Sequence, residues 1–227
     1  MCAQYQVELN SNILNHDFGI KISDSLNSFK SRLLPYQPAP VIVKNKSGQL
    51  QLAKMNFSLV PAWSKEPKLK FATHNARIET VTTKPTWRIP FTKQHCIIPI
   101  QSFYESVHEG PLAGHIIEFS ECHNKQLYAA GIFDRWIDPN TQKSIFSFAI
   151  LTTDPSPFIL DNGHDRSPIF LDAKDAVDWL NLELTAEQYI NFLKTCKIAP
   201  ELTVKIDRPL KGFNSAKKKQ SPDKDSL

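Results

Sequence analysis

The sequence is short of glycine and cysteine, and it has no long apolar run. Only 7 glycines stand against 16 prolines in 227 residues, which favours rigid, extended connections between elements. No Gly-rich loop of the kind that cradles phosphates is present. No stretch approaches the roughly 18 apolar residues that a membrane-spanning helix needs, and no apolar segment typical of a secretory signal follows Met1. These absences argue against a P-loop nucleotide-binding protein, a membrane protein and a secreted one.

The cysteines are scattered and form no CxxC motif; they are Cys2, Cys96, Cys122 and Cys196. In a chain of this size that pattern favours free thiols in a reducing, cytoplasmic setting. The neighbouring pairs His95-Cys96 and Cys122-His123 lack the spacing of zinc ligands. We therefore expect no metal ion and no other cofactor.

The charge balance is only mildly basic, at +4. Half of that excess comes from the end of the chain, which has four lysines and two aspartates: Lys217, Lys218, Lys219, Lys224, Asp223 and Asp225. A balance this small is far from that of a polycation, so nucleic-acid binding would depend on a local patch. The polar composition after Phe213 predicts a disordered tail over residues 213–227, behind a single domain over residues 1–212.

Most of the body has the composition of β-strands. Runs rich in Ile, Val, Phe and Tyr are separated by turn clusters, and they cover residues 39–44, 50–60, 95–107, 115–120, 126–136 and 144–153. Helices are fewer, and we expect them at residues 24–34, at 173–181 after an Asp172 N-cap, and at 186–197. The last begins with a capping box of Thr185 and Gln188. This pattern predicts an α+β domain with a curled or barrel-like, mostly antiparallel sheet and a few peripheral helices.

Three polar segments are candidates for chemistry. The first carries Asn75, Arg77 and Glu79 at alternating positions. The guanidinium of Arg77 could donate two hydrogen bonds to a phosphate, and Glu79 could orient that guanidinium. The alternative for this segment is a helix start with Asn75 as its N-cap. Each of the other two segments contributes a group suited to proton transfer.

Glu105 follows the apolar run 97–100, where burial favours the protonated form of a carboxylic acid. His164 stands in a loop bounded by Gly163 and Pro168, with Arg166 close by. An imidazole in such a loop could act as a general acid or base beside a phosphate clamp.

Cys2 becomes the amino-terminal residue when Met1 is removed, and it then carries an amine and a thiol on adjacent carbons. An α-amine and a thiol both titrate near neutrality, so both nucleophiles are available together. The amine can condense with an aldehyde to an imine, and the thiolate can close a five-membered thiazolidine ring on the same carbon. Cys2 is therefore the candidate nucleophile.

In order and spacing, these motifs resemble those of the SOS-response-associated peptidase (SRAP) family. The resemblance runs from Met1 to about residue 180 and rests on Cys2, Pro61-Ala62-Trp63, Asn75-Ala76-Arg77-Ile78-Glu79, Phe103-Tyr104-Glu105 and His164-Asp165-Arg166-Ser167-Pro168. The chain departs from the family pattern at Ala3 and Gln4, which stand where Gly and Arg are usual, and at Ser167, which replaces Met.

The resemblance implies a sensor of abasic sites in single-stranded DNA that links Cys2 covalently to the opened deoxyribose as a thiazolidine. By the same resemblance, Asn75 positions the sugar, Glu105 moves protons on the amine and imine, and His164 assists ring opening and reversal. The DNA-binding residues would be Arg77, Arg166 and Trp63.

The resemblance also implies lyase- or peptidase-type chemistry, with removal of Met1 by the protein itself as its most economical form. It implies a monomer that works in the cytoplasm and, in a bacterium, at the nucleoid during DNA damage. The alternatives are an N-terminal-nucleophile hydrolase such as a glutamine amidotransferase, and a non-catalytic DNA-binding module. The sequence lacks the Asn-Gly oxyanion motif of such a hydrolase, because Asn75 is followed by Ala76. The replacements at Ala3 and Gln4 would favour the non-catalytic module.

Overall fold

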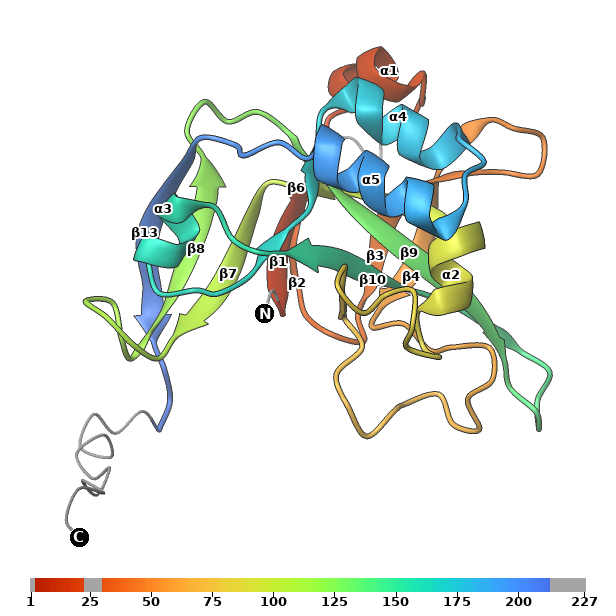
Figure 1. Ribbon diagram of the computed structural model, residues 1–227, viewed down its shortest axis with the longest axis horizontal. Helices are drawn as coiled ribbons and strands as arrows, with labels where there is room; N and C mark the ends of the chain where they lie inside the picture. Colours follow the sequence, from red (N-terminus) through yellow and green to blue (C-terminus); the bar gives the residue numbers. More distant parts are fainter. Residues whose placement is uncertain (1–2, 23–29, 213–227) are drawn as a thin grey trace, which may run out of the picture.

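The computed structural model describes residues 3–22 and 30–212. Cys2 and the tail over residues 213–227 lie outside the described residues, as do residues 23–29. Within the described part, the strands form a five-stranded and an eight-stranded sheet (Figure 1).

The five-stranded sheet is antiparallel throughout, and β1 lies between the central strand β7 and the edge strand β2. Its order is β13-β8-β7-β1-β2. The bounds are β1 Gln4–Glu8, β2 Lys30–Leu33, β7 Ser102–Val107, β8 His115–Glu121 and β13 Leu202–Pro209. Because β1 pairs with β7, residues 4–6 lie against the strand that carries Glu105.

The larger sheet closes on itself as a barrel. Its main strands are β3 Pro38–Lys44, β4 Leu50–Phe57, β6 His95–Ile100, β9 Leu127–Ile137 and β10 Ser144–Thr153. They follow the order β10-β4-β3-β6-β9, and β9 pairs again with β10 to complete the ring. Three short strands join it: β5 Asn75–Arg77, β11 Ser167–Pro168 and β12 Phe170–Leu171.

The helices cover the outside of the sheets. They are α1 Ser11–Phe18, α2 Arg88–Lys93, α3 Pro157–Asp161, α4 Ala173–Asn181 and α5 Ala186–Cys196. Figure 1 shows α1, α4 and α5 grouped above the barrel, on the side away from the amino terminus. Trp179 of α4 fixes this layer, because its indole donates to the carbonyls of Cys96 and Gly131 at 3.2 Å each.

Aromatic side chains join the two sheets in one core. Tyr5 of β1 meets Phe57 of β4 edge-on at 5.2 Å between ring centroids. Phe103 of β7 contacts Phe170 of β12 at 5.8 Å. All four are buried, and full burial of such a side chain contributes roughly 1.5–3 kcal/mol. The strand with Glu105 and the strands of the barrel are therefore held as one packed unit.

The α+β expectation is confirmed, with its barrel-like sheet and peripheral helices. The Asp172 N-cap and the Thr185–Gln188 capping box are also present as expected.

The single run expected over residues 95–107 is wrong, because the chain leaves the barrel after β6 and enters the other sheet as β7. Gln101 marks the crossing, where its N–H donates to the carbonyl of Gln6 at 2.8 Å. An apolar run of this length does not by itself reveal a change of sheet.

The helix expected over residues 24–34 is wrong at its end, where Lys30–Leu33 form β2. That segment pairs with β1, Lys30 bonds Glu8 at 2.8 Å, and Leu33 is buried. Pairing with a sheet edge overrides the local helical spacing. The alternative helix start at Asn75 is also wrong, because residues 75–77 form strand β5 beside β10.

Candidate active site

A polar pocket opens beside Ala3, the first residue that the structure describes. Its lining comes from the start of β1, from β7, from the end of α3 and from the loop that follows it. Besides Ala3, the lining includes the polar side chains of Gln4, Tyr104, Glu105, His108 and His164. Cys2 directly precedes Ala3 in the sequence, but it lies outside the described residues.

Glu105 and His164 form a buried acid–imidazole pair in the pocket. Nε2 of His164 lies 2.8 Å from Oε2 of Glu105, and only 6% and 2% of the two side chains are exposed. On the other side of the ring, Nδ1 lies 2.9 Å from the carbonyl oxygen of Arg166 and 3.3 Å from its amide nitrogen. The shorter contact favours a protonated Nδ1, because a carbonyl oxygen can only accept.

That arrangement fixes what the pair can do. With Nδ1 protonated, the contact between Nε2 and Oε2 needs one further proton, carried either by the carboxyl group or by the imidazolium. The pair can therefore receive a proton and return it without moving either side chain. Sequence reasoning expected both residues to act on protons, and the structure places them in direct contact.

The loop that presents His164 depends on Gly163. Its φ of +85° lies in the left-handed region, and an added Cβ would stand 2.6 Å from Cγ1 of Val107 and 2.9 Å from the carbonyl oxygen of Glu109. Only glycine combines this backbone conformation with such a close approach to the end of β7. The amide of His164 then donates to the carbonyl of Ile159 at 3.2 Å, which fixes the loop to α3.

Arg166 is committed to partners inside the protein. Its Nη1 and Nη2 bond the two carboxylate oxygens of Glu79 at 3.0 and 2.9 Å, Nη1 also bonds Asp154, and Nη2 donates to the carbonyl of Thr152. Only 7% of the Arg166 side chain is exposed. This differs from the expectation of a phosphate contact, because two carboxylates already neutralise the guanidinium.

Glu79 therefore orients Arg166 rather than Arg77, because both of its oxygens bond the Arg166 guanidinium. Partial burial opposes the charge on Glu79, but hydrogen bonds from Arg166 and the nearby charge of Arg77 hold the pKa of this carboxyl below its usual value. Glu79 remains ionised and holds the loop of His164 against the barrel.

Asn75 and Arg77 lie on β5, which runs parallel to β10. The side chain of Asn75 is buried, whereas Arg77, two residues on, is exposed. Within residues 3–22 and 30–212, no salt bridge involves Arg77, so its charge is available to a ligand. The structure thus separates two arginines that the sequence treated alike.

His74 belongs to the same neighbourhood, although sequence reasoning did not select it as a site residue. Burial lowers the pKa of its imidazole, and the nearby charge of Glu105 acts in the opposite direction. Its ring packs edge-on against Phe57 at 5.7 Å. Its only sequence signal is its place directly before Asn75, and a single histidine among the 7 in the sequence carries little weight.

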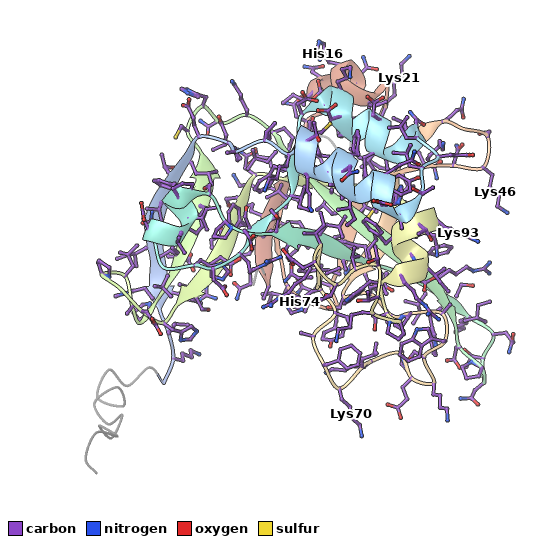
Figure 2. All side chains as sticks on the ribbon, in the orientation of Figure 1. His16, Lys21, Lys46, Lys70, His74 and Lys93 are labelled. Atoms are coloured by element: carbon purple, nitrogen blue, oxygen red, sulfur yellow. The ribbon has the colours of Figure 1, made fainter. Side chains whose placement is uncertain are left out.

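Trp63 stands on the long loop between β4 and β5, with 54% of its surface exposed. Its indole N–H donates to the carbonyl of Pro85 at 3.2 Å, and the neighbouring amide of Ala62 donates to buried Asp134 at 2.8 Å. The ring is therefore exposed and fixed at once. Figure 2 shows Lys70 of the same loop at the lower edge of the molecule, below His74.

No three His, Cys, Asp or Glu side chains gather to hold a metal ion in the part of the chain that the structure describes. The same residues include no helix long and apolar enough to cross a membrane.

The described residues thus form a barrel joined to a second sheet, with a buried acid–imidazole pair in a pocket beside the first strand. The sequence model of the SOS response associated peptidase (SRAP) family matches residues 1–206. The chain belongs to this family.

Its relatives include proteins with known names and solved structures. The abasic site processing protein YoaM of Bacillus subtilis is 32% identical over 168 residues, which is 70% of each chain. The abasic site processing protein HMCES of Xenopus tropicalis is 28% identical over 177 residues, 65% of this chain and 52% of that one. A crystal structure of a Bacteroides thetaiotaomicron protein has a TM-score of 0.73 at 23% identity and covers 91% of this chain and 92% of its own. That structure supports the fold.

Proposed function

We propose that this protein recognises abasic sites in single-stranded DNA and forms a covalent, protective link to them through Cys2. Family membership and the names of the curated relatives support an action on abasic sites. The observation that carries the chemistry is the buried Glu105–His164 pair in the pocket that Ala3 lines. A reacting amino terminus needs proton-transfer groups within reach, and the place of this pair in the pocket beside Ala3 supports that role for it.

The link forms in two balanced steps. The amine of Cys2 adds to the aldehyde carbon of the opened deoxyribose, and loss of one water leaves an imine. The thiol then adds to the same carbon, its proton passes to the nitrogen, and a thiazolidine results. No oxidant, reductant or cofactor is needed, because each step is an addition or a loss of water accompanied by proton transfers.

Glu105 and His164 carry out different proton transfers in this reaction. The closed sugar opens when a proton leaves the anomeric hydroxyl and another reaches the ring oxygen, which suits the imidazole of His164. Glu105 takes the proton from the attacking amine and returns it to the departing water. Because the two groups are in contact, a proton that one of them accepts can pass directly to the other.

The remaining residues position the DNA. Asn75 holds the opened sugar with its amide, and exposed Arg77 binds a flanking phosphate. Trp63 offers a fixed aromatic surface for an unpaired base. Arg166, held by Glu79, keeps the His164 loop in place, and any direct contact of Arg166 with phosphate would require it to leave those partners.

Release of Met1 is part of the proposal, because a thiazolidine requires a free α-amine on Cys2. The peptidase activity in the family name fits this cleavage, carried out by the protein on its own Met1-Cys2 bond. We further propose that the protein acts as a monomer on single strands in the cytoplasm and, in a bacterium, at the nucleoid.

The test is incubation with an abasic single-stranded oligonucleotide, followed by denaturing electrophoresis and intact mass measurement. We expect a chain that begins at Cys2 and a heat-stable adduct that forms without reductant. Cys2→Ala keeps the amine, so borohydride should trap its imine while no stable adduct forms without reductant. A heat-stable adduct from Cys2→Ala, or full activity with Met1 retained, would falsify the ring assignment. Reaction with a glutamine analogue instead would favour a hydrolase.

A further inference from the structure

Gln4 lies where two arginines converge, although both come from distant parts of the chain. Its amide oxygen accepts from Nη2 and Nε of Arg32 at 2.7 and 3.1 Å, and from Nη2 of Arg208 at 3.3 Å. Asp207 lies between the two guanidiniums and bonds Arg32 at 2.9 and 3.0 Å and Arg208 at 2.9 Å. We call these four residues the Gln4 cluster.

The sheet is shaped to bring these side chains together. Arg32 is on β2 and Arg208 is on β13, the two edges of the five-stranded sheet. The pairing of β13 with β8 shifts register between Ile206 and Arg208, which marks a β-bulge at Asp207. A bulge re-aims the side chains beside it, so that Asp207 and Arg208 both reach the side of the sheet where Gln4 lies.

Arg32 is fixed and Arg208 is accessible. The guanidinium carbon of Arg32 lies 3.5 Å from the centroid of the Tyr104 ring, which adds a cation–π contact to its hydrogen bonds. The exposed fractions of the side chains are 27% for Arg32, 20% for Asp207 and 48% for Arg208. One carboxylate serves two guanidiniums, so the cluster keeps one net positive charge at the surface.

The cluster adjoins the candidate active site. Gln4 and Tyr104, which touch its arginines, also line the pocket that contains Glu105 and His164. The lining of the same pocket also includes the exposed acidic residues Glu109, Asp161 and Asp165, which come from other segments than Gln4. An anion would be attracted to the arginines beside Gln4 rather than to these carboxylates.

We propose that Arg32 and Arg208 bind a phosphodiester group of the DNA strand next to the reacting nucleotide. This inference rests on the proposed function for the identity of the ligand. Gln4 itself brings no charge, and the two arginines supply the cation beside the start of β1. Forked N–H donors match the oxygens of a phosphate, and Arg208 is exposed enough to turn toward one.

The first test measures binding without chemistry. The probe is a single-stranded oligonucleotide with a tetrahydrofuran abasic analogue, which has no aldehyde and cannot react. Arg208→Gln should weaken binding about fivefold at 0.1 M salt and reduce the slope of log K against log salt by about 0.7. Arg208→Lys should keep most of the affinity, because it retains the charge.

Lys174→Gln is the matched control. Lys174 is 81% exposed and, like Arg208, is paired with aspartate, but it lies on α4, away from the amino terminus (Figure 1). Its loss should leave affinity and slope unchanged. If Arg208→Gln and Lys174→Gln have equal affinities, salt slopes and melting temperatures, the proposal is overturned.

The second test locates the phosphate. Each linkage near the analogue is replaced in turn by a neutral methylphosphonate. Neutralising one linkage should weaken binding by the wild-type protein and should not change binding by Arg208→Gln. Adding Gln4→Arg to Arg208→Gln should restore affinity. A linkage profile that is the same in both proteins would contradict the site. Because this probe cannot react, failure of wild-type protein to link true abasic DNA would count against the proposed function and leave this result standing.

Discussion

Arg77 and Arg166 come from motifs of similar appearance, and the fold gives them opposite surroundings. Arg77 is exposed on β5, and no salt bridge involves it within the described ranges. Arg166 is buried and bonded to Glu79, Asp154 and the carbonyl of Thr152. The first has a charge to offer to DNA, whereas the second uses its charge to fix a loop.

The same division runs through the whole site. Glu105, His164 and Arg166 form a buried half, which is protected from solvent and held rigidly. Trp63, Arg77 and Arg208 are exposed, and we propose that they form the half that contacts DNA. Burial favours controlled proton transfer, and exposure favours contact with a charged polymer. We therefore expect the buried half to control the reaction rate and the exposed half to control affinity.

The largest effects should come from the buried half. His164→Ala should slow formation and reversal of the link, and Glu105→Gln should chiefly slow formation, by about 10²–10⁴-fold. Single-turnover rates on saturating abasic DNA measure formation, and transfer to a competitor strand measures reversal. His16→Ala is the control, because that side chain is 88% exposed on α1. Wild-type rates in both site variants would remove the buried pair from the mechanism.

Trp63→Ala should weaken binding of single strands by about 1–3 kcal/mol, because an exposed aromatic ring that stacks on a base contributes this much. Trp63→Phe should retain part of the affinity, since a smaller ring can still stack. Ile198→Ala, which removes another exposed apolar side chain, in the segment that follows α5, serves as the control. The link should form at the wild-type rate once the DNA is saturating. A slower rate at saturation would place Trp63 in the chemistry.

Arg77→Gln and Arg166→Gln make the sharpest pair for the comparison of the two halves. Arg77→Gln should cost about fivefold in affinity at 0.1 M salt and reduce the salt slope by about 0.7, without a change in melting temperature. Arg166→Gln should lower the melting temperature by roughly 2–8 °C, the shift expected for a loss of about 1–2 kcal/mol, and leave the slope unchanged. An equal change of slope in both would show that Arg166 also meets phosphate.

The smallest effect should be a loss of stability in mild acid. Burial lowers the pKa of His95 despite bonds to the carbonyls of Phe91 and Trp179, and it lowers the pKa of His74. Both imidazoles therefore stabilise the fold fully above the ordinary value of 6.5, and this contribution is lost as the pH falls below it. His95→Gln should flatten the dependence of melting temperature on pH in that window. Exposed His16→Gln should not.

Much of the architecture could be read from local patterns. Alternation and composition identified most of the barrel strands, and the Thr185–Gln188 box identified α5, because these signals act within a few residues. The split of residues 95–107 into β6 and β7 had no local signal. Neither did β2, whose strand form depends on the free edge of β1.

The candidate site divides in the same way. The sequence by itself determined the chemical types: a cysteine at position 2, an amide, an acid, an imidazole and arginines in the SRAP order. Only the tertiary structure decided that His164 lies against Glu105, that Glu79 bonds Arg166, and that Arg208 meets Gln4. Such pairings join residues tens to hundreds of positions apart. They depend on how strands are ordered in a sheet, which a linear pattern does not encode.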